Sequence, residues 1–162
     1  GVHPNGDLTR AEAARIFYRL DDGDYPSFTR RMSNSTFKDI SAKNWFYEPV
    51  ETLYNIGRLE GKSKDTFAPN APISRAEFAA LAARFQNLKY TSGKVFSDVE
   101  QGHWAYSYIN AASEAGWIQG YPDGTLRHNK TITRTETRKL VQRMSNRHVT
   151  HDKLKAPPGR NP

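Results

Sequence analysis

Three arginines of this sequence stand in the same short motif, and a guanidinium in that position suits the binding of an anion. The motifs are Thr9-Arg10-Ala11-Glu12, Ser74-Arg75-Ala76-Glu77 and Thr133-Arg134-Thr135-Glu136. A guanidinium offers a planar fork of donors that pairs with both oxygens of a carboxylate, which an ammonium does less well. A cation in the first turn of a helix is locally unfavourable, so its recurrence indicates a partner. Two interpretations remain open, and one arginine can serve both: a clamp on a ligand carboxylate, or an ion pair with Asp39 or Asp98 of a neighbouring repeat.

The same motifs predict where helices begin. In a capping box a Ser or Thr hydroxyl accepts from the amide three residues on, while the Glu at that position reaches back to the cap amide. The six cap residues are Thr9, Glu12, Ser74, Glu77, Thr133 and Glu136. Because capping accounts for the three glutamates, we do not expect them to be catalytic, and the chain is not expected to be an enzyme.

Apolar residues of helical period follow each box, and an arginine ends each stripe. The stripes are Ile16, Phe17 and Leu20, then Leu81, Ala82 and Phe85, then Leu140, Val141 and Met144; the arginines are Arg19, Arg84 and Arg143. Three like helices, each apolar on one face, are expected to bury those faces against one another as a central bundle.

The boxes belong to a longer internal repeat. Residues 37–85 and 96–144 align without a gap at an offset of 59 (96−37 = 59), and residues 1–20 match only the second half of the unit. Each unit is too small to bury its own core, so residues 1–144 are expected to form a single domain. The remaining segments are linkers at 21–36 and 86–95, and a basic, Pro-rich tail or linker at 145–162.

Each full repeat predicts two helices joined by a tight loop. A Phe-x-Asp motif precedes a turn, a first helix begins near Trp45 or Trp104, and Gly57 or Gly116 follows it where a left-handed cap is needed. In the third repeat the loop reads Gly-Tyr-Pro-Asp-Gly-Thr, a turn in which Pro presets φ and Gly accepts positive φ. The capped helix comes next, and the fold class is therefore all-α.

Composition points to an anionic partner but does not choose one. The chain has 24 Lys and Arg against 17 Asp and Glu, a net charge of +7 and a pI of about 9.7. Nucleic acid, anionic lipid and an acidic cell-wall polymer would each suit that charge. The absence of Cys excludes disulfides and thiolate metal sites. No apolar run of about 18 residues is present, so no membrane span is expected. Gly1 does not begin a signal peptide, so any export signal is expected outside this chain.

The order Phe-x-Asp, His-Trp-Ala, Gly-Tyr-Pro-Asp-Gly-Thr, Ile-Thr-Arg-x-Glu resembles the S-layer homology repeat of bacterial surface proteins, over roughly residues 1–144. The resemblance implies three repeats arranged as a three-pronged, pseudo-threefold spindle around the capped helices. It also implies an extracellular module that binds an anionic, often pyruvylated, cell-wall polysaccharide non-covalently. Neither nucleic acid, a cofactor nor a metal is expected. In similar domains the arginines of the box and nearby loop residues line grooves between prongs, which makes Arg10, Arg75 and Arg134 candidates for glycan binding.

Further candidate glycan-binding residues lie in the loops. Gln119, Gly120, Tyr121 and Asp123 stand on a turn, where side chains are well placed for ligand hydrogen bonds. Trp45 and Trp104 either stack on a sugar face or serve as core or staple residues. Asp39 and Asp98 are expected to be turn or cap residues rather than metal ligands, and we expect no metal site at His148 and His151.

Departures from the family pattern leave a second function open. The first repeat lacks its Phe-x-Asp motif and Trp helix, so upstream sequence or another molecule is expected to cover an apolar strip beside Ile16 and Phe17. The loop 61–66 of the second repeat also departs from the pattern. The alternative to glycan anchoring is a structural or protein-interaction copy that has lost ligand binding.

Overall fold

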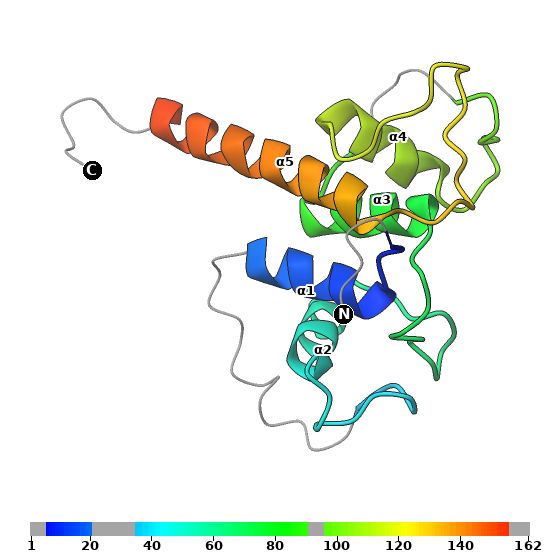
Figure 1. Cartoon of the computed structure of the whole chain (residues 1–162), viewed down its shortest axis with the longest axis vertical. Coiled ribbons are helices and arrows are strands. Elements are labelled where there is room, and N and C mark those ends of the chain that lie inside the picture. Colours follow the sequence, from blue (N-terminus) through cyan, green and yellow to red (C-terminus); the bar gives the residue numbers. More distant parts are fainter. Residues whose placement is uncertain (1–5, 21–34, 91–95, 156–162) are drawn as a thin grey trace.

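The computed structural model describes residues 6–20, 35–90 and 96–155, and these fold into five helices (Figure 1). The helices are α1 Arg10–Leu20, α2 Tyr47–Asn55, α3 Arg75–Phe85, α4 Tyr106–Ala115 and α5 Arg134–Lys155. Extended pairing within the described residues is limited to isolated β-bridges. The predicted all-α fold, with helix-loop-helix repeats around the capped helices, is confirmed.

A closed ring of backbone hydrogen bonds brings the first turns of α1, α3 and α5 together. The amide of Leu8 donates to the carbonyl of Ile132 at 2.9 Å, that of Ile73 to Leu8 at 2.9 Å, and that of Ile132 to Ile73 at 3.2 Å. These three residues precede the three boxes, and their side chains are buried. Each repeat therefore satisfies the backbone of its neighbour at this point, and the chain acquires threefold pseudosymmetry.

All three boxes cap their helices as predicted. The amides of Glu12, Glu77 and Glu136 donate to the hydroxyls of Thr9, Ser74 and Thr133 at 3.0–3.1 Å. In the first two boxes the Glu carboxylate also accepts from the cap amide, at 3.0 Å on Thr9 and 3.3 Å on Ser74. The cap residues thus fix where α1, α3 and α5 begin.

The core is centred on Phe17 of α1. Its ring lies 5.5 Å from Phe78, 5.2 Å from Phe85 and 5.3 Å from Trp117, centroid to centroid. Phe17 itself is fully buried, because α3 and the segment after α4 cover it. Ile16, one residue earlier, is only partly buried.

The first helix of each full repeat packs on the capped helix of the preceding repeat, α2 on α1 and α4 on α3 (Figure 1). The Tyr18 hydroxyl of α1 donates to Glu48 of α2 at 3.0 Å. The Arg84 guanidinium of α3 lies over the Tyr108 ring of α4 at 4.4 Å. Each repeat is therefore completed by its neighbour, as the size of the unit required.

Helices α2 and α4 begin two residues later than the sequence indicated. Phe46 and Ala105, not Trp45 and Trp104, stand at their N-caps, and neither makes a side-chain capping bond. The buried positions at this corner are taken by Phe46 and Ala105, so the indoles remain on the turn outside the helix.

The predicted left-handed glycines are confirmed. Gly57 and Gly116 have φ of +78° and +89° after α2 and α4, and Gly124 has φ of +85° in the Pro-Asp-Gly turn. These values are accessible to glycine at little cost and strain other residues.

The aspartate of each Phe-x-Asp motif holds the loop that leads to the capped helix. Asp39 accepts from the amides of Phe67 at 2.9 Å and Ala68 at 2.8 Å. Asp98 accepts from Leu126 at 2.8 Å and Arg127 at 2.7 Å. Burial alone would raise the pKa of Asp98, but these amide bonds outweigh it and lower the pKa. The expected turn role of both aspartates agrees with this geometry.

The C-terminal segment differs from the expected tail, because α5 continues through residue 145 and ends at Lys155. The apolar stripe ends at Met144, so periodicity alone gave no reason to extend the helix. The linker at 21–36 falls largely outside the described residues, as do residues 91–95 of the second linker and 156–162 of the tail.

Gly61 provides a test of how tightly the loop of the second repeat packs against the Phe37 side chain. A Cβ at Gly61 would lie 2.5 Å from the Phe37 ring and 2.6 Å from the Thr66 carbonyl, whereas one at Gly102 would meet nothing within 4 Å. We expect Gly61→Ala to lower the free energy of unfolding by about 1–3 kcal/mol through overpacking, and Gly102→Ala to change it little. Urea denaturation measures both. Equal stability of the two variants would contradict the packing described.

Candidate functional site

Arg75 reaches from the start of α3 into the loop of the third repeat. Its Nε donates to the Leu126 carbonyl at 2.9 Å, Nη2 donates to the Gln119 carbonyl, and Nη1 pairs with Glu136. Only 1% of the residue is exposed. Its nitrogens thus hold the loop and the next capped helix together.

Arg10 makes the equivalent contacts one repeat earlier. Its Nε donates to the Phe67 carbonyl at 2.8 Å, Nη2 to the Glu60 carbonyl at 3.1 Å, and Nη1 pairs with Glu77. Burial lowers the pKa of Arg10, while the charges of Glu77 and Asp39 act in the opposite direction.

Arg134 differs from Arg10 and Arg75 because its guanidinium donates to both oxygens of one carboxylate, that of Glu12. Its Nε and Nη2 donate to the two oxygens of Glu12, at 2.9 and 2.8 Å, and 22% of the side chain is exposed. The residue equivalent to Phe67 and Leu126 is Val2, which lies outside the described residues. The hydrogen bond from Arg134 and those with Thr9 outweigh burial, which acts in the opposite direction, and lower the pKa of Glu12.

The three arginines and three box glutamates therefore form a closed ring of ion pairs, Arg10 with Glu77, Arg75 with Glu136 and Arg134 with Glu12. Each glutamate binds the arginine of the preceding capped helix, and Glu12 and Glu77 also accept from their own cap amides. Of the two interpretations of the arginines, the inter-repeat pair is present, with a box glutamate in place of Asp39 or Asp98 as the hydrogen-bonded partner. Their role in glycan binding stays a prediction.

A groove of about 520 Å³ lies between the second and third repeats. Arg10 and Phe67 line its inner part, and Lys62, Arg84 and Trp104 line it as well. The Lys62 ammonium lies 3.2 Å from Glu77 and is half exposed, while Arg84 pairs with Glu60 at 3.4 Å. The groove thus offers the half-exposed Lys62 ammonium and the Trp104 side chain on one lining.

The two tryptophans are the large hydrophobic residues that remain exposed in the described structure, Trp45 by 54% and Trp104 by 57%. Their interpretation as core residues was therefore wrong. Trp104 lines the groove and is stacked by the His103 ring at 5.8 Å. Trp45 is covered by the Arg15 guanidinium at 4.4 Å. The two indoles are equivalent in sequence, but only Trp104 borders this groove.

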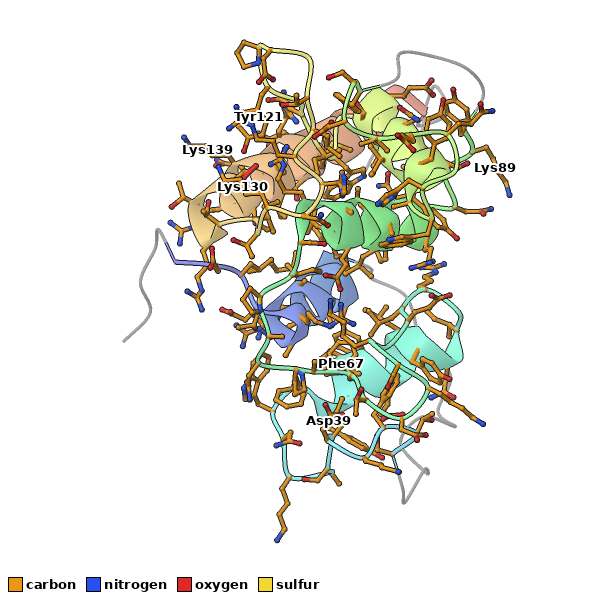
Figure 2. The ribbon with its side chains drawn as sticks, turned by 90° about the vertical axis from the view of Figure 1, so that its right-hand side faces the viewer. Asp39, Phe67, Lys89, Tyr121, Lys130 and Lys139 are labelled. Atoms are coloured by element: carbon orange, nitrogen blue, oxygen red, sulfur yellow. The ribbon has the colours of Figure 1, made fainter. Side chains whose placement is uncertain are left out.

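The predicted turn of the third repeat gathers cations around Tyr121. Arg127 lies 3.7 Å from the centre of its ring, and the Lys130 ammonium donates to its hydroxyl at 3.1 Å. Lys139, at the start of α5, lies on the same side of the molecule (Figure 2). Asp123 accepts from the amide and hydroxyl of Thr125, which lowers the pKa of Asp123. Tyr121 thus belongs to a basic cluster, whereas Asp123 serves its own turn.

Gln119 and Gly120 contribute to the packing of the third repeat in different ways. The carbonyl of Gln119 accepts from Arg75, and Gly120 lies so close to Phe96 that a Cβ would approach the ring to 2.4 Å. Their side-chain roles in ligand binding stay predictions.

Sequence reasoning missed Lys62, Arg84, Arg127 and Lys130 as candidate site residues. The sequence held a signal for two of these residues. Lys62 aligns with the candidate Tyr121 at the repeat offset, and Arg84 is one of the three arginines that end the apolar stripes. Only the packed repeats show that Lys62 and Arg84 line the groove and that Arg127 and Lys130 surround Tyr121.

A second groove, of about 500 Å³, lies between α1 and α5. Leu8, Ile16 and Val141 give it an apolar part, beside Glu12 and Arg134. That upstream sequence, or a second molecule through self-association, covers this groove stays a prediction.

The comparisons agree with the repeat structure. The family model described as the S-layer homology domain matches residues 36–79 and 95–137. The chain is 35% identical over 149 residues to the cellulosome-anchoring protein of Acetivibrio thermocellus. The alignment covers 86% of this chain and 32% of that protein. The chain belongs to the S-layer homology family, and the resemblance identified from the sequence is confirmed.

Other relatives differ in the rest of their length. The chain is 38% identical over 112 residues to an amylopullulanase of Thermoanaerobacterium thermosulfurigenes, covering 68% of this chain and 6% of that protein. It is 32% identical over 94 residues to the S-layer protein sap of Bacillus anthracis, covering 57% of this chain and 11% of that protein. The chain therefore spans a third or less of these relatives.

Membership of this family makes the chain a cell-surface anchoring module, which confirms the extracellular, cell-wall location expected from the sequence. In the part of the chain that the structure describes, no helix combines the length and apolarity needed to cross a bilayer. Over the same residues, no cluster of His, Cys, Asp or Glu has the makeup of a metal site.

The ring of ion pairs can be tested by comparing Arg75→Ala with Arg134→Ala. Arg75 is fully buried with three partners, so its removal leaves Glu136 and two carbonyls unpaired, and we expect a loss of roughly 3–5 kcal/mol in the free energy of unfolding. Arg134 is partly exposed, and we expect a loss of roughly 1–3 kcal/mol. Urea denaturation measures both losses. A change below about 1 kcal/mol for Arg75→Ala would contradict its structural role.

Glu12 should make part of the stability depend on pH. Its folded pKa lies below the unfolded value of about 4.3, so its stabilising contribution is present above that pH and lost as the pH falls through the folded pKa. We expect Glu12→Gln to be less stable than the native chain at about pH 6, with the difference shrinking towards pH 3. Denaturant midpoints across this range measure the difference. A difference that does not change with pH would contradict the assignment.

Proposed function

We propose that the chain is a non-catalytic module that holds a larger surface protein to an anionic wall polysaccharide, in which pyruvylated sugars supply the negative charge. The observation that carries the proposal is the exposed Trp104 bordering the same groove as the half-exposed Lys62. A sugar ring needs an aromatic face to stack on and its carboxylate needs a cation, and the two stand here at one groove.

The proposed contacts follow from which side chains are free to change partners. The carboxylate of the glycan binds Lys62, which now lies beside Glu77 at a distance typical of an exposed pair. Such a pair is worth about 0–1 kcal/mol, so a ligand carboxylate can replace it at little cost. The buried Arg10 stays with its carbonyls and Glu77 and keeps the groove in shape.

The names of the relatives support an anchoring role. One is a cellulosome-anchoring protein and one an S-layer protein, whereas the amylopullulanase shares only 6% of its length with this chain. A module common to proteins of such different names is expected to supply attachment rather than turnover, and we propose no catalytic role for this chain.

The alternative is a structural copy that has lost glycan binding. The commitment of Arg10 and Arg75 to neighbouring repeats favours it, because neither offers an unused fork to a ligand. Under this alternative Lys62 and Trp104 would be ordinary surface residues.

Binding to wall material isolated from the bacterium that makes this protein separates the two. We expect the native chain to bind, and affinity to fall as ionic strength rises from about 0.01 to 0.15 M, because exposed charges become screened. Trp104→Ala and Lys62→Ala should each weaken binding by about ten-fold, the effect of losing an interaction of roughly 1.4 kcal/mol. Co-sedimentation with the wall material measures these affinities.

Lys89→Ala is the matched control for Lys62→Ala. Lys89 is an exposed lysine just beyond α3 (Figure 2), so its removal changes the net charge equally without touching the groove. Equal weakening by both lysine variants would indicate non-specific attraction. Absence of binding by the folded native chain would overturn the proposal in favour of the structural alternative.

A further inference from the structure

We propose that His103 and His128 form a pH-sensitive contact that holds Trp104 at the groove near neutral pH and releases it as the pH falls. The two imidazole rings lie 4.5 Å apart, centroid to centroid, and both residues are partly buried. Each histidine is followed in the chain by a residue that lines the groove between the second and third repeats, Trp104 after one and Asn129 after the other. Because that groove is the proposed glycan site, this regulation rests on the proposed function.

The second repeat builds the same turn and loop without either histidine. At the repeat offset of 59, His103 corresponds to Asn44 and His128 to Pro69 (103−44 = 59 and 128−69 = 59). The amides of Asn44 and His103 each donate at 2.9 Å to the carbonyl three residues earlier. The carbonyls of Pro69 and His128 each accept at 3.0 Å from the second residue of a capped helix. Since the fold does not require the two histidines, their contact has to be explained by another property.

The hydrogen bonding of His103 fits its neutral form. Its Nδ1 atom accepts from the amide of Ala105 at 3.0 Å, and Ala105 is the fully buried N-cap residue of α4. A proton on Nδ1 would face that N–H group and remove its acceptor. Burial and the charge of His128 lower the pKa of His103. Protonation of His103 therefore costs the bond that fixes the residue directly before α4.

Groups from three segments surround the contact. Burial acts to raise the pKa of Asp98, but bonds from backbone amides and the charge of His128 lower it, so Asp98 and the charged form of His128 stabilise each other. Glu100 meets His103 through its backbone carbonyl, and α3 meets His128 through the amide of Ala76. Asp98 therefore favours the first proton on His128. A second proton, on His103, places two cations with their ring centres 4.5 Å apart.

Protonation of His103 should separate the two rings. The Ala105 amide loses its acceptor, and the two imidazolium ions repel each other. The Nδ1 atom of His128 is buried without a hydrogen-bond partner, so water that reaches it as the rings separate favours the open arrangement. His103 stacks on Trp104 at 5.8 Å, but 57% of Trp104 is exposed, and the attraction of a cation to an indole is weak at exposed sites. We therefore expect the turn that places Trp104 at the groove to loosen in acid.

The contact is expected to open below about pH 6.5. The folded pKa of His103 lies below the unfolded value of about 6.5, so the stabilising contribution of the contact is complete above that pH and is lost as the pH falls through the folded pKa. We expect affinity for wall material to fall over the same range, by up to about ten-fold, which is the loss expected for Trp104→Ala.

Two variants replace each histidine with the residue of the second repeat. His103→Asn removes the group that titrates. His128→Pro removes the neighbouring charge, and the backbone suits it, because the preceding residue has φ of +58°, as Ala68 has +59° before Pro69. An NMR titration of the His103 imidazole in the full chain should give a midpoint below about 6.5, and the midpoint should rise in His128→Pro. A midpoint that stays the same in folded His128→Pro would overturn the contact.

Hydrogen exchange at the Ala105 amide measures the opening itself. We expect its protection factor to fall in the native chain from about pH 7.5 to about pH 5, and to be lower but independent of pH in His103→Asn. The amide of Val50 is the internal control, because it donates to Phe46 at 3.0 Å in the second repeat, where no histidine stands. Constant protection of Ala105 in the native chain, or an equal fall at Val50, would overturn the inference.

Wall binding at the same two pH values separates this proposal from the one on which it rests. We expect the affinity of the native chain to fall in acid and that of His103→Asn to fall less, a comparison that also corrects for protonation of the polymer. An equal fall in both chains would overturn the regulation and leave anchoring intact. Failure of the folded native chain to bind at either pH would overturn anchoring, while the exchange at Ala105 would still decide whether the contact opens.

Discussion

The structure depends on the junction where three helices begin beside one another. Backbone bonds among Leu8, Ile73 and Ile132 close one ring, and the arginine–glutamate pairs of the three boxes close another around it. Each glutamate neutralises an arginine that would otherwise stand unfavourably at a helix N-terminus. Because the pairs are largely buried and carry further bonds to carbonyls, they fix how the repeats are oriented.

This junction separates the side chains that hold the structure together from those that we propose to bind the ligand. Arg10 and Arg75 are buried and bonded to the loops of the following repeats, and Arg10 also lines the groove between the second and third repeats. Lys62 and Trp104 are exposed along the same groove, and Lys130 and Arg127 surround Tyr121 in the other repeat. Exposed cations exchange partners at little cost, whereas buried pairs do not. Substitutions of the exposed side chains can therefore change what a groove binds without disturbing the helix bundle.

The two full repeats differ at positions beside the grooves and loops and agree at positions that hold the backbone. Tyr54 and Ser113, like Lys62 and Tyr121, are equivalent positions with different side chains, whereas Asp39 and Asp98 hold their loops through the same two amide bonds. Gly61 and Gly120 both lie against the phenylalanine of the Phe-x-Asp motif. Backbone-holding positions leave little choice of residue, because an added Cβ or a lost acceptor affects the fold directly. Grooves of different character follow from one architecture.

Local rules determined the caps, the left-handed glycines and the all-α repeat, because each depends on residues a few positions apart. They also located the arginines, though not their partners: Glu77 lies 67 residues from Arg10, and Glu12 lies 122 residues from Arg134. The tertiary structure alone decided that Phe17 is covered by Trp117 and that Trp104 stays in solvent at a groove. An aromatic side chain has the same local pattern in a core and at a binding surface, and only the neighbouring repeat determines which it joins.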